Sequence, residues 1–166
     1  MRRLSALPSF AAVLLLAVAG AACGADRQPA AEPLADFPQA DLTIVSGGHE
    51  HLFRVWIADT PARRKQGLMF VKQLGAERGM LFLFDPAQYT AFWMKNTYIP
   101  LDLLFVAPSG RITNIVERAL PMSTDPLPSA EPVSGVVELA GGTASRLGIQ
   151  AGDRVVYPAF NALRTG

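Results

Sequence analysis

The sequence has few of the residues that build metal centres, disulfide frameworks or charged binding faces. It contains one Cys and two His among its 166 residues. A single Cys excludes an intramolecular disulfide framework and a Cys-rich zinc site, and two His leave little room for a His-rich metal centre. Charged residues make up 17% of the chain, below the about 25% that is usual in soluble domains. The formal net charge of +1 argues against a nucleic-acid partner, which would need a concentrated basic face.

The N-terminus has the pattern of a secretory signal. Arg2 and Arg3 precede an apolar run over residues 10–22, which is too short for a bilayer core that takes roughly 20 residues to cross. Small residues close this run directly before Cys23. We therefore predict a signal peptide over residues 1–22.

Cys23 follows Ala21 and Ala22, which resembles the bacterial lipoprotein box, although Gly20 stands where that box prefers Leu. We predict that Cys23 is lipidated and anchors an exported protein in the periplasm or cell envelope. The alternative is ordinary signal cleavage, which would leave a free Cys near the new terminus. Residues 23–40 are rich in Ala and Pro and are predicted to form a flexible tether.

The remaining chain reads as one domain over residues 41–158, followed by a tail over residues 159–166. Short apolar strands alternate with Gly- and Pro-containing turns. Strands are expected over residues 41–46, 51–58, 79–84, 91–95, 101–106, 111–118, 133–139 and 154–157. Thr60 and Pro61 start a short helix that Gly67 ends in the left-handed conformation, and Thr143 caps a helical turn that Gly148 ends. Hairpin spacing without long crossover helices predicts a mainly β (α+β) fold, a compact antiparallel barrel-like or strongly bent sheet with two short helices.

Several motifs between residues 42 and 157 carry a family resemblance. They are Arg64-x-x-Gly67-Leu68-Met69, Gly79-Met80-Leu81-Phe82, Phe92-Trp93-Met94-Lys95-Asn96-Thr97, Ile99-Pro100-Leu101-Asp102, Val137-Glu138-Leu139-Ala140-Gly141 and Gly152-Asp153. In this order they resemble the bacterial and archaeal family called domain of unknown function number 192. The resemblance implies a small β-rich domain that is often exported, and it implies no established reaction.

Two carboxylates interrupt strands that are otherwise apolar. Asp102 lies within residues 101–106 and Glu138 within residues 133–139. Burying an unpaired charge is costly, so each should be partnered or lie at a rim. Strand alternation places Trp93 and Lys95 on one face, and Lys95 is the obvious partner for Asp102. Such a pair, with Asn96 and Thr97 making turn hydrogen bonds, is a purely structural explanation of this segment.

The functional alternative is a pocket for a small polar ligand or a sugar, floored by the Trp93 ring. Arg64 could pair with either carboxylate or hold an anionic ligand group. Lys95 or Glu138 could serve as a base if its pKa were shifted by burial. The sequence has no nucleophile motif, however, so we favour binding over catalysis. We expect no cofactor. The candidate ligand-binding residues are Trp93, Lys95, Asn96, Thr97, Asp102, Glu138 and Arg64.

Two other functions stay open. Thioether sulfurs suit Cu(I), and Met69, Met80 and Met94 are the candidate ligands, although Met usually fills cores. His49 and His51 share a strand face but would need a third ligand for a divalent metal. Alternatively, the domain is a non-enzymatic accessory module that docks an envelope protein partner through the Pro-rich loop over residues 119–132.

Overall fold

A computed structural model describes residues 33–160 of the chain. Its strands are β1 (Gln39–Ser46), β2 (His49–Ala58), β3 (Arg78–Gln88), β4 (Ala91–Phe92), β5 (Leu101–Val106), β6 (Ile112–Ala119), β7 (Leu127–Pro128), β8 (Val133–Ala140) and β9 (Arg154–Val156). Its helices are α1 (Pro61–Gln66), α2 (Thr143–Leu147) and a single 3-10 turn, Pro158–Phe160. No helix within this described part is long and apolar enough to cross a membrane.

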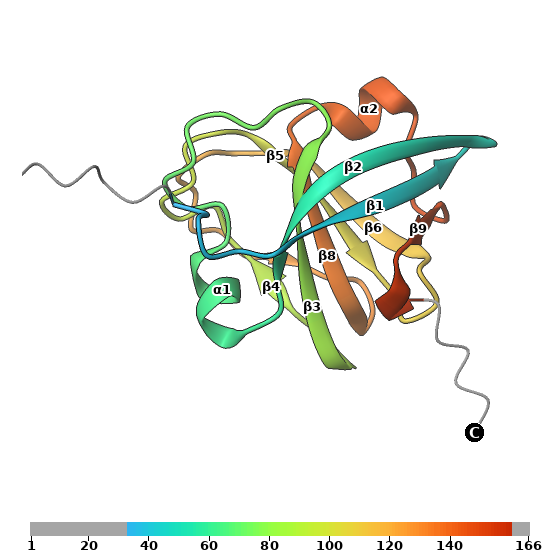
Figure 1. Ribbon diagram of the computed structural model, residues 1–166, viewed down its shortest axis with the longest axis horizontal. Coiled ribbons are helices and arrows are strands. Elements are labelled where there is room, and N and C mark those ends of the chain that lie inside the picture. The colour runs from blue at the N-terminus through green and yellow to red at the C-terminus, as the bar shows by residue number, and fades with distance from the viewer. Residues whose placement is uncertain (1–32, 161–166) are drawn as a thin grey trace, which may run out of the picture. The chain divides into compact units, whose positions relative to one another are not determined.

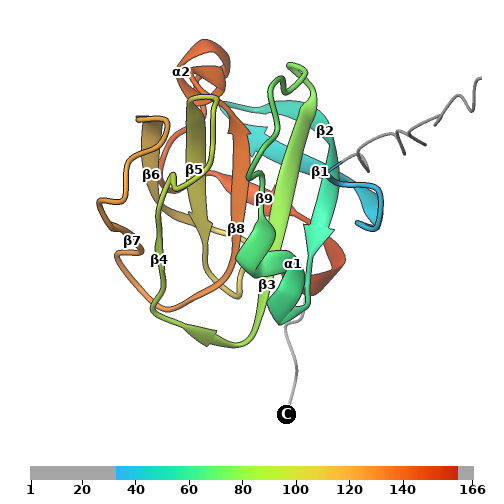
Figure 2. The same ribbon diagram turned by 90° about the vertical axis from the view of Figure 1, so that its left-hand side faces the viewer.

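Seven of the strands form one curled sheet in the order β6-β5-β8-β3-β2-β1-β9 (Figure 1). β4 pairs with β7 in a separate ribbon (Figure 2). Backbone hydrogen bonds bring the two edges of the large sheet together. The N–H of Ile112 donates to the Asp153 carbonyl, and the N–H of Gly152 donates to the Ile112 carbonyl, each at 2.8 Å. The N–H of Val155 donates to the Gly110 carbonyl, also at 2.8 Å. The predicted mainly β, strongly bent and barrel-like sheet with two short helices is confirmed.

Local sequence signals act as expected at two junctions. Gly47 and Gly48 have φ angles of 55° and 80° and join β1 to β2 in a two-residue hairpin, a turn that requires positive φ at both positions. The Thr60 hydroxyl accepts a hydrogen bond from the N–H of Arg63 and caps α1. Gly67 ends α1 at a positive φ of 51°, but its ψ of −141° lies outside the left-handed helical region that we predicted.

Three features of the sheet differ from the sequence prediction. β2 and β3 are parallel, because residues 59–77 with α1 provide the crossover that a parallel pair needs. β3 continues through Asp85 and Pro86 to Gln88, and its pairing with β8 is irregular after Leu83, which is where a strand tolerates Pro. β4 ends at Phe92, so the predicted strand over residues 91–95 is shorter.

Ordered packing begins before residue 41, our predicted start of the domain. Leu34 and Phe37 are buried, and β1 starts at Gln39. The predicted tether over residues 23–40 is therefore packed at its C-terminal end, since two bulky apolar side chains find a core there. The predicted signal peptide and Cys23 lie outside the described residues.

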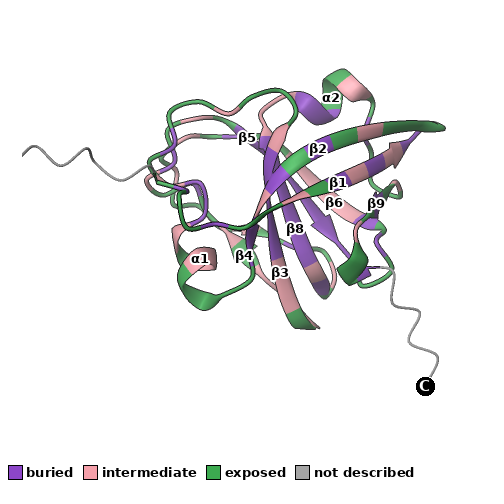
Figure 3. Cartoon of the chain, in the orientation of Figure 1, coloured by how far each residue is buried: buried purple, intermediate pink, exposed green. Residues whose placement is uncertain are grey.

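Two apolar cores lie on opposite faces of β8, which is buried along most of its length (Figure 3). The first core draws side chains from all seven strands of the large sheet, so the curled sheet encloses it. The second core covers the other face of β3, β8 and β5 with side chains from the loops, among them Leu68, Val71 and Met94. Because strand residues alternate between faces, neighbouring residues of β8 enter different cores.

Asp102 ties three segments of the chain together and is completely buried. Its Oδ1 accepts from the N–H groups of Arg118 at 2.8 Å and Gly142 at 2.9 Å. Its Oδ2 accepts from the N–H of Ala144 at 2.8 Å. The N-cap residue of α2 is Gly142 and not Thr143 as predicted, and Gly142 has no side chain with which to cap the helix. The Asp102 carboxylate from β5 does this instead.

Replacing Asp102 by Ala should destabilise the domain by about 3 kcal/mol or more, because three buried N–H groups lose their acceptor. Asp102→Asn keeps one oxygen and should lose less. Urea unfolding gives the free energies, and the control is Asp125→Ala, which removes an exposed carboxylate bonded to Ser123. Equal losses in the Asp102→Ala and Asp125→Ala variants would show that the buried acceptor is unimportant.

Candidate functional site

A cavity of about 250 Å³ lies between α1, the residues after it, β3 and the segment that follows β4. Figure 2 shows α1 in front of β3, with β4 to one side. The cavity is lined by Arg64, Lys65, Gln66, Gly67, Leu68, Met69, Phe82, Phe84, Thr90, Ala91, Phe92, Trp93, Lys95, Thr97 and Glu138. Its lining combines aromatic rings, three basic side chains and one acid.

Glu138 is the acid of this cavity, and its position follows from the sheet register. It lies on β8 opposite Met80 of β3 and Leu103 of β5. Both neighbours are fully buried members of the second core. Glu138 itself is 5% exposed, and its buried Oε2 has no hydrogen-bond partner within the described residues.

Burial raises the pKa of the Glu138 carboxyl from its ordinary value of 4.5 to about 8. Desolvation is the physical cause, because the charged form loses water and gains no compensating partner. The ion pairs formed between described residues are Arg54–Asp41, Arg63–Asp59 and Arg111–Glu131, and none of them involves Glu138. Near neutral pH the group is therefore a carboxylic acid that can donate a proton or a hydrogen bond.

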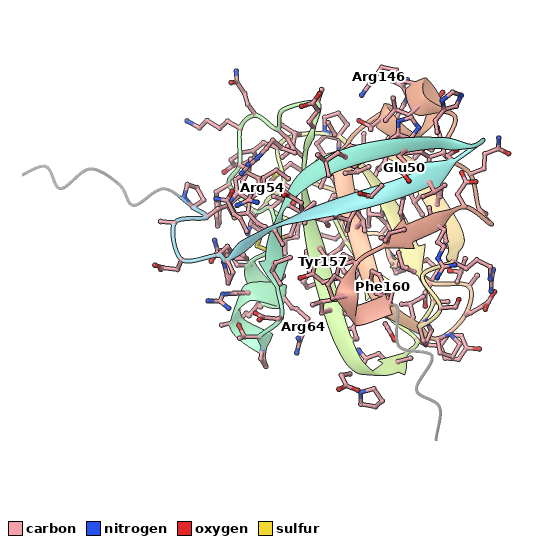
Figure 4. The ribbon with its side chains drawn as sticks, turned by 45° about the vertical axis from the view of Figure 1, so that its right-hand side comes forward. Glu50, Arg54, Arg64, Arg146, Tyr157 and Phe160 are labelled. Carbon is pink, nitrogen blue, oxygen red and sulfur yellow. The ribbon has the colours of Figure 1, made fainter. Side chains whose placement is uncertain are left out.

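Arg64 contributes a cation held in a fixed position. Its Nη1 donates to the carbonyl oxygens of Asp59 at 2.7 Å and Leu83 at 3.0 Å. Its guanidinium carbon lies 5.7 Å from the centre of the Phe84 ring. These hydrogen bonds use one of three guanidinium nitrogens, so the planar fork keeps donors for an anionic group. Figure 4 labels Arg64 beside α1, at the end of the sheet away from Arg146.

Lys95 contributes a second cation. Its Nζ lies 5.4 Å from the centre of the Trp93 ring, within the range of a cation–π contact. Lys95 is exposed, and 52% of the Trp93 surface is exposed. Both side chains therefore stand where the cavity meets solvent. Met94, between them in the chain, is buried in the second core. Trp93 and Lys95 therefore lie on the side opposite Met94, as predicted, although β4 ends at Phe92.

The segment carrying Lys95 is held in an unusual backbone conformation. Asn96 has a φ of 58°, and its carbonyl accepts from the N–H of Phe70, whose φ is 67°. The Thr97 carbonyl accepts from the N–H of Met122, whose φ is 63°. Non-glycine residues at positive φ persist only where surrounding contacts hold them, and they cluster at functional sites. Here the three of them fix the loop that presents Lys95.

Aromatic rings form the apolar part of the cavity lining. Phe82 and Phe92 meet edge to face with their centroids 4.8 Å apart. Phe92 also packs against Phe105 of the second core at 6.1 Å. Such contacts make a rigid wall that is continuous with the core.

The structure brings five of the seven candidate residues to the cavity: Arg64, Trp93, Lys95, Thr97 and Glu138. Asn96 and Asp102 are not in its lining. The predicted Lys95–Asp102 pair is wrong, because Asp102 is buried against three backbone N–H groups. Asn96 instead supports the loop, and its Nδ2 lies 3.9 Å from the Met69 sulfur.

The Phe side chains of the lining and Lys65 were not predicted from the sequence. Phe82 and Phe84 share a face of β3 with Met80, which lies opposite Glu138. Period-2 alternation would have placed these three together, but the pairing of β3 with β8 could not be derived from spacing. Lys65 lies on an exposed turn of α1, where a solvated basic residue is the ordinary expectation.

The candidate copper ligands occupy different surroundings. Met80 and Met94 are buried in the second core, whereas Met69 lines the cavity. His49 is exposed and His51 is half-buried on β2. The described part of the chain holds no cluster of three or more His, Cys, Asp or Glu side chains suited to a metal ion.

The chain is similar to two solved structures. A protein of unknown function from Novosphingobium aromaticivorans DSM 12444 is 42% identical, with a TM-score of 0.73, covering 80% of this chain and 94% of that one. A protein from Sinorhizobium meliloti 1021, named as a candidate transcription regulator, is 40% identical, with a TM-score of 0.72, covering 74% and 96%. No curated protein matches the chain.

A family model also matches most of the described domain. It spans residues 42–157 and is that of DUF192, described as "Uncharacterized ACR, COG1430". The match covers every residue that lines the cavity and most of both cores, and Leu34, Phe37 and Phe160 lie outside it. The chain therefore belongs to the DUF192 family.

Proposed function

We propose that this domain binds a small polar molecule in the cavity beside α1. The observation that carries the proposal is Glu138, a buried carboxyl with one unpartnered oxygen in the lining of a cavity. Buried polar groups in folded proteins nearly always have a partner, and an exception asks for an explanation. A ligand that completes the hydrogen bonding of Glu138 supplies one.

The other lining residues suit an organic ligand with an anionic group. Arg64, Lys65 and Lys95 place three positive charges around the cavity, and Arg64 keeps a fork that fits a carboxylate or phosphate. Phe82, Phe84 and Phe92 offer apolar surface. The volume of about 250 Å³ lies just below the roughly 300–1,000 Å³ of drug-sized sites, which favours a metabolite of few heavy atoms.

Binding is favoured over catalysis by the chemistry of the lining. Its side chains include no Ser, Cys or His, and its two hydroxyls are those of Thr90 and Thr97. The Thr97 hydroxyl donates to the backbone carbonyl of Lys95. An activated nucleophile needs a base within hydrogen-bond reach. Glu138 could act as a general acid, but the cavity lining provides no Ser, Cys or His nucleophile to act with it.

We also propose that the protein is exported and anchored at the cell envelope through a lipid on Cys23. Support comes from the sequence alone: the basic start, the short apolar run and the Ala-Ala-Cys junction. Docking of an envelope protein through residues 119–132 and Cu(I) binding by Met69, Met80 and Met94 stay predictions.

Ligand binding should depend on the basic side chains at the cavity. A thermal-shift panel of organic acids, amino acids, sugars and nucleotides identifies a binder. In isothermal titration, Lys95→Gln should then weaken that binder by about 10-fold or more, the usual effect of losing a charge-assisted hydrogen bond. The control is Lys72→Gln, because Lys72 is exposed and lies outside the cavity lining. Stabilisation by no compound, or equal affinity in both variants, would contradict binding at this cavity.

Stability should fall with rising pH through Glu138. The folded state raises the pKa of this group from 4.5 to about 8, so the folded protein holds the proton more tightly than the unfolded chain. Its stabilising effect is complete below pH 4.5 and is lost as the pH rises toward 8. Glu138→Gln removes this titration. We compare the free energies of unfolding as the value for Glu138→Gln minus the value for the unsubstituted protein. This difference should increase by about 3–4 kcal/mol as the pH rises from about 5 to about 8.

Denaturant unfolding at several pH values measures this difference. The matched control is Glu131→Gln, which alters an exposed carboxylate paired with Arg111. A pH-independent difference between Glu138→Gln and the unsubstituted protein would show that the carboxyl titrates normally.

Cys23 should carry the lipid. In a bacterial host fed a palmitate analogue, the full chain should be labelled and should sediment with membranes. The Cys23→Ser variant should be unlabelled and should stay in the supernatant, because it lacks the thiol that accepts the lipid. Membrane association without label in the unsubstituted protein would point to another anchor.

A further inference from the structure

We propose that the cavity takes a dipolar small molecule, with a protonated amine directed at Glu138 and an anionic group held by Arg64 and Lys95. This inference rests on the proposed function, since it names the chemical class of ligand for the same site. It follows from the opposite requirements of the inner and outer parts of the cavity.

The inner part calls for a cation. Glu138 is 5% exposed and its Oε2 has no partner among the described residues. Its surroundings on β3 and β5, Met80 and Leu103, are apolar and offer no donor. An ammonium group would provide both the counter-charge and the hydrogen bonds that an ionised carboxylate needs. The rings of Phe82 and Phe92 add surfaces on which a cation is favoured.

An ammonium group is a better partner for Glu138 than a neutral group is. Ionising a carboxyl with a pKa of about 8 costs about 10-fold in the binding constant at about pH 7. Hydrogen bonds between ionised groups are roughly twice as strong as neutral ones, and the low dielectric of the site increases the difference. The charged pair therefore offsets the cost of ionising Glu138.

The outer part calls for an anion. Arg64, Lys65 and Lys95 line the cavity, and Glu138 is the one acidic side chain among its described lining residues. A simple amine would meet three positive charges on its way in. A simple carboxylate would satisfy those charges but would leave Glu138 without a partner. A molecule that carries both groups meets both requirements, and an ω-amino carboxylate is the plainest compound of this kind.

The test is isothermal titration of the full chain with three matched series of increasing chain length. These are ω-amino carboxylates, carboxylates in which a methyl group replaces the amine, and amines in which a methyl group replaces the carboxylate. The best amino carboxylate should bind at least about 10-fold more tightly than its matched carboxylate and its matched amine, because each of those lacks one charged contact.

Proton release gives a second readout that is specific to Glu138. At about pH 7 a group with a pKa of about 8 is mostly protonated, and an ammonium ligand expels that proton, so about nine-tenths of a proton should leave on binding. Repeating the titration in buffers of different ionisation enthalpy counts the protons. Glu138→Gln should abolish the release and the preference for the amine while keeping the affinity for the matched carboxylate. Glu131→Gln should change neither.

The possible outcomes separate this inference from the proposed function. Equal affinity for the amino carboxylate and its matched carboxylate, or binding without proton release, would overturn the dipolar ligand and leave small-molecule binding standing. Failure of these series together with the wider panel would overturn both. If Glu138→Gln does not fold, the comparison of the three series and the proton count in the unsubstituted protein still decide.

Discussion

The burial of β8 on both faces is the constraint on which the rest of the structure depends. With β3 on one side and β5 on the other, its residues alternate between an enclosed core and a second core. The enclosed core is closed by the sheet itself, but the second core has no opposing sheet. It is covered instead by the segment that follows α1, the β4–β7 ribbon and the loops around them. Irregular cover of this kind leaves room for a cavity.

Asp102 and Glu138 show how one residue class can serve two purposes. Both are carboxylates on adjacent strands of the same sheet, and both are buried. Asp102 accepts three backbone N–H groups and so acts as a fixed part of the framework. Glu138 has an unpartnered oxygen and a raised pKa. The number of available donors therefore decides which carboxylate is part of the framework and which can respond to a ligand.

Local signals allowed much of the fold to be predicted from the sequence. The Gly47-Gly48 turn, the Thr60 cap and the apolar run through Phe82 depend on neighbours in the chain, and the hairpin and helix they predict are present. The parallel pairing of β2 with β3 could not be predicted, because short spacing between strands favours hairpins. It depends on which strands the second core brings together.

The candidate site was predictable in the same partial way. Glu138 and Lys95 stood out because polar residues in apolar surroundings are unusual, and both lie at the cavity. The pairing of Lys95 with Asp102 failed because the N–H groups that Asp102 accepts come from Arg118, Gly142 and Ala144. Those residues are distant in the chain and carry no side-chain signal for the contact. Backbone donors are present at every position, so sequence patterns cannot reveal which of them a buried acid will find.

The arrangement also separates stability from the site. The enclosed core and the Asp102 hydrogen bonds lie on the face of the sheet opposite Glu138, so they hold the fold without using any cavity residue. The acid without a full set of partners lies on the other face, in the cavity lining. The positive φ angles of Phe70, Asn96 and Met122 occur in loops whose neighbouring residues line this cavity. The φ of 47° at Arg118 and the unpartnered Nε2 of His51 lie elsewhere in the fold. A domain tolerates such features only when the remaining interactions leave a margin of stability. The position of Glu138 in the lining of a cavity is what makes a binding role the simplest explanation of its unpartnered oxygen.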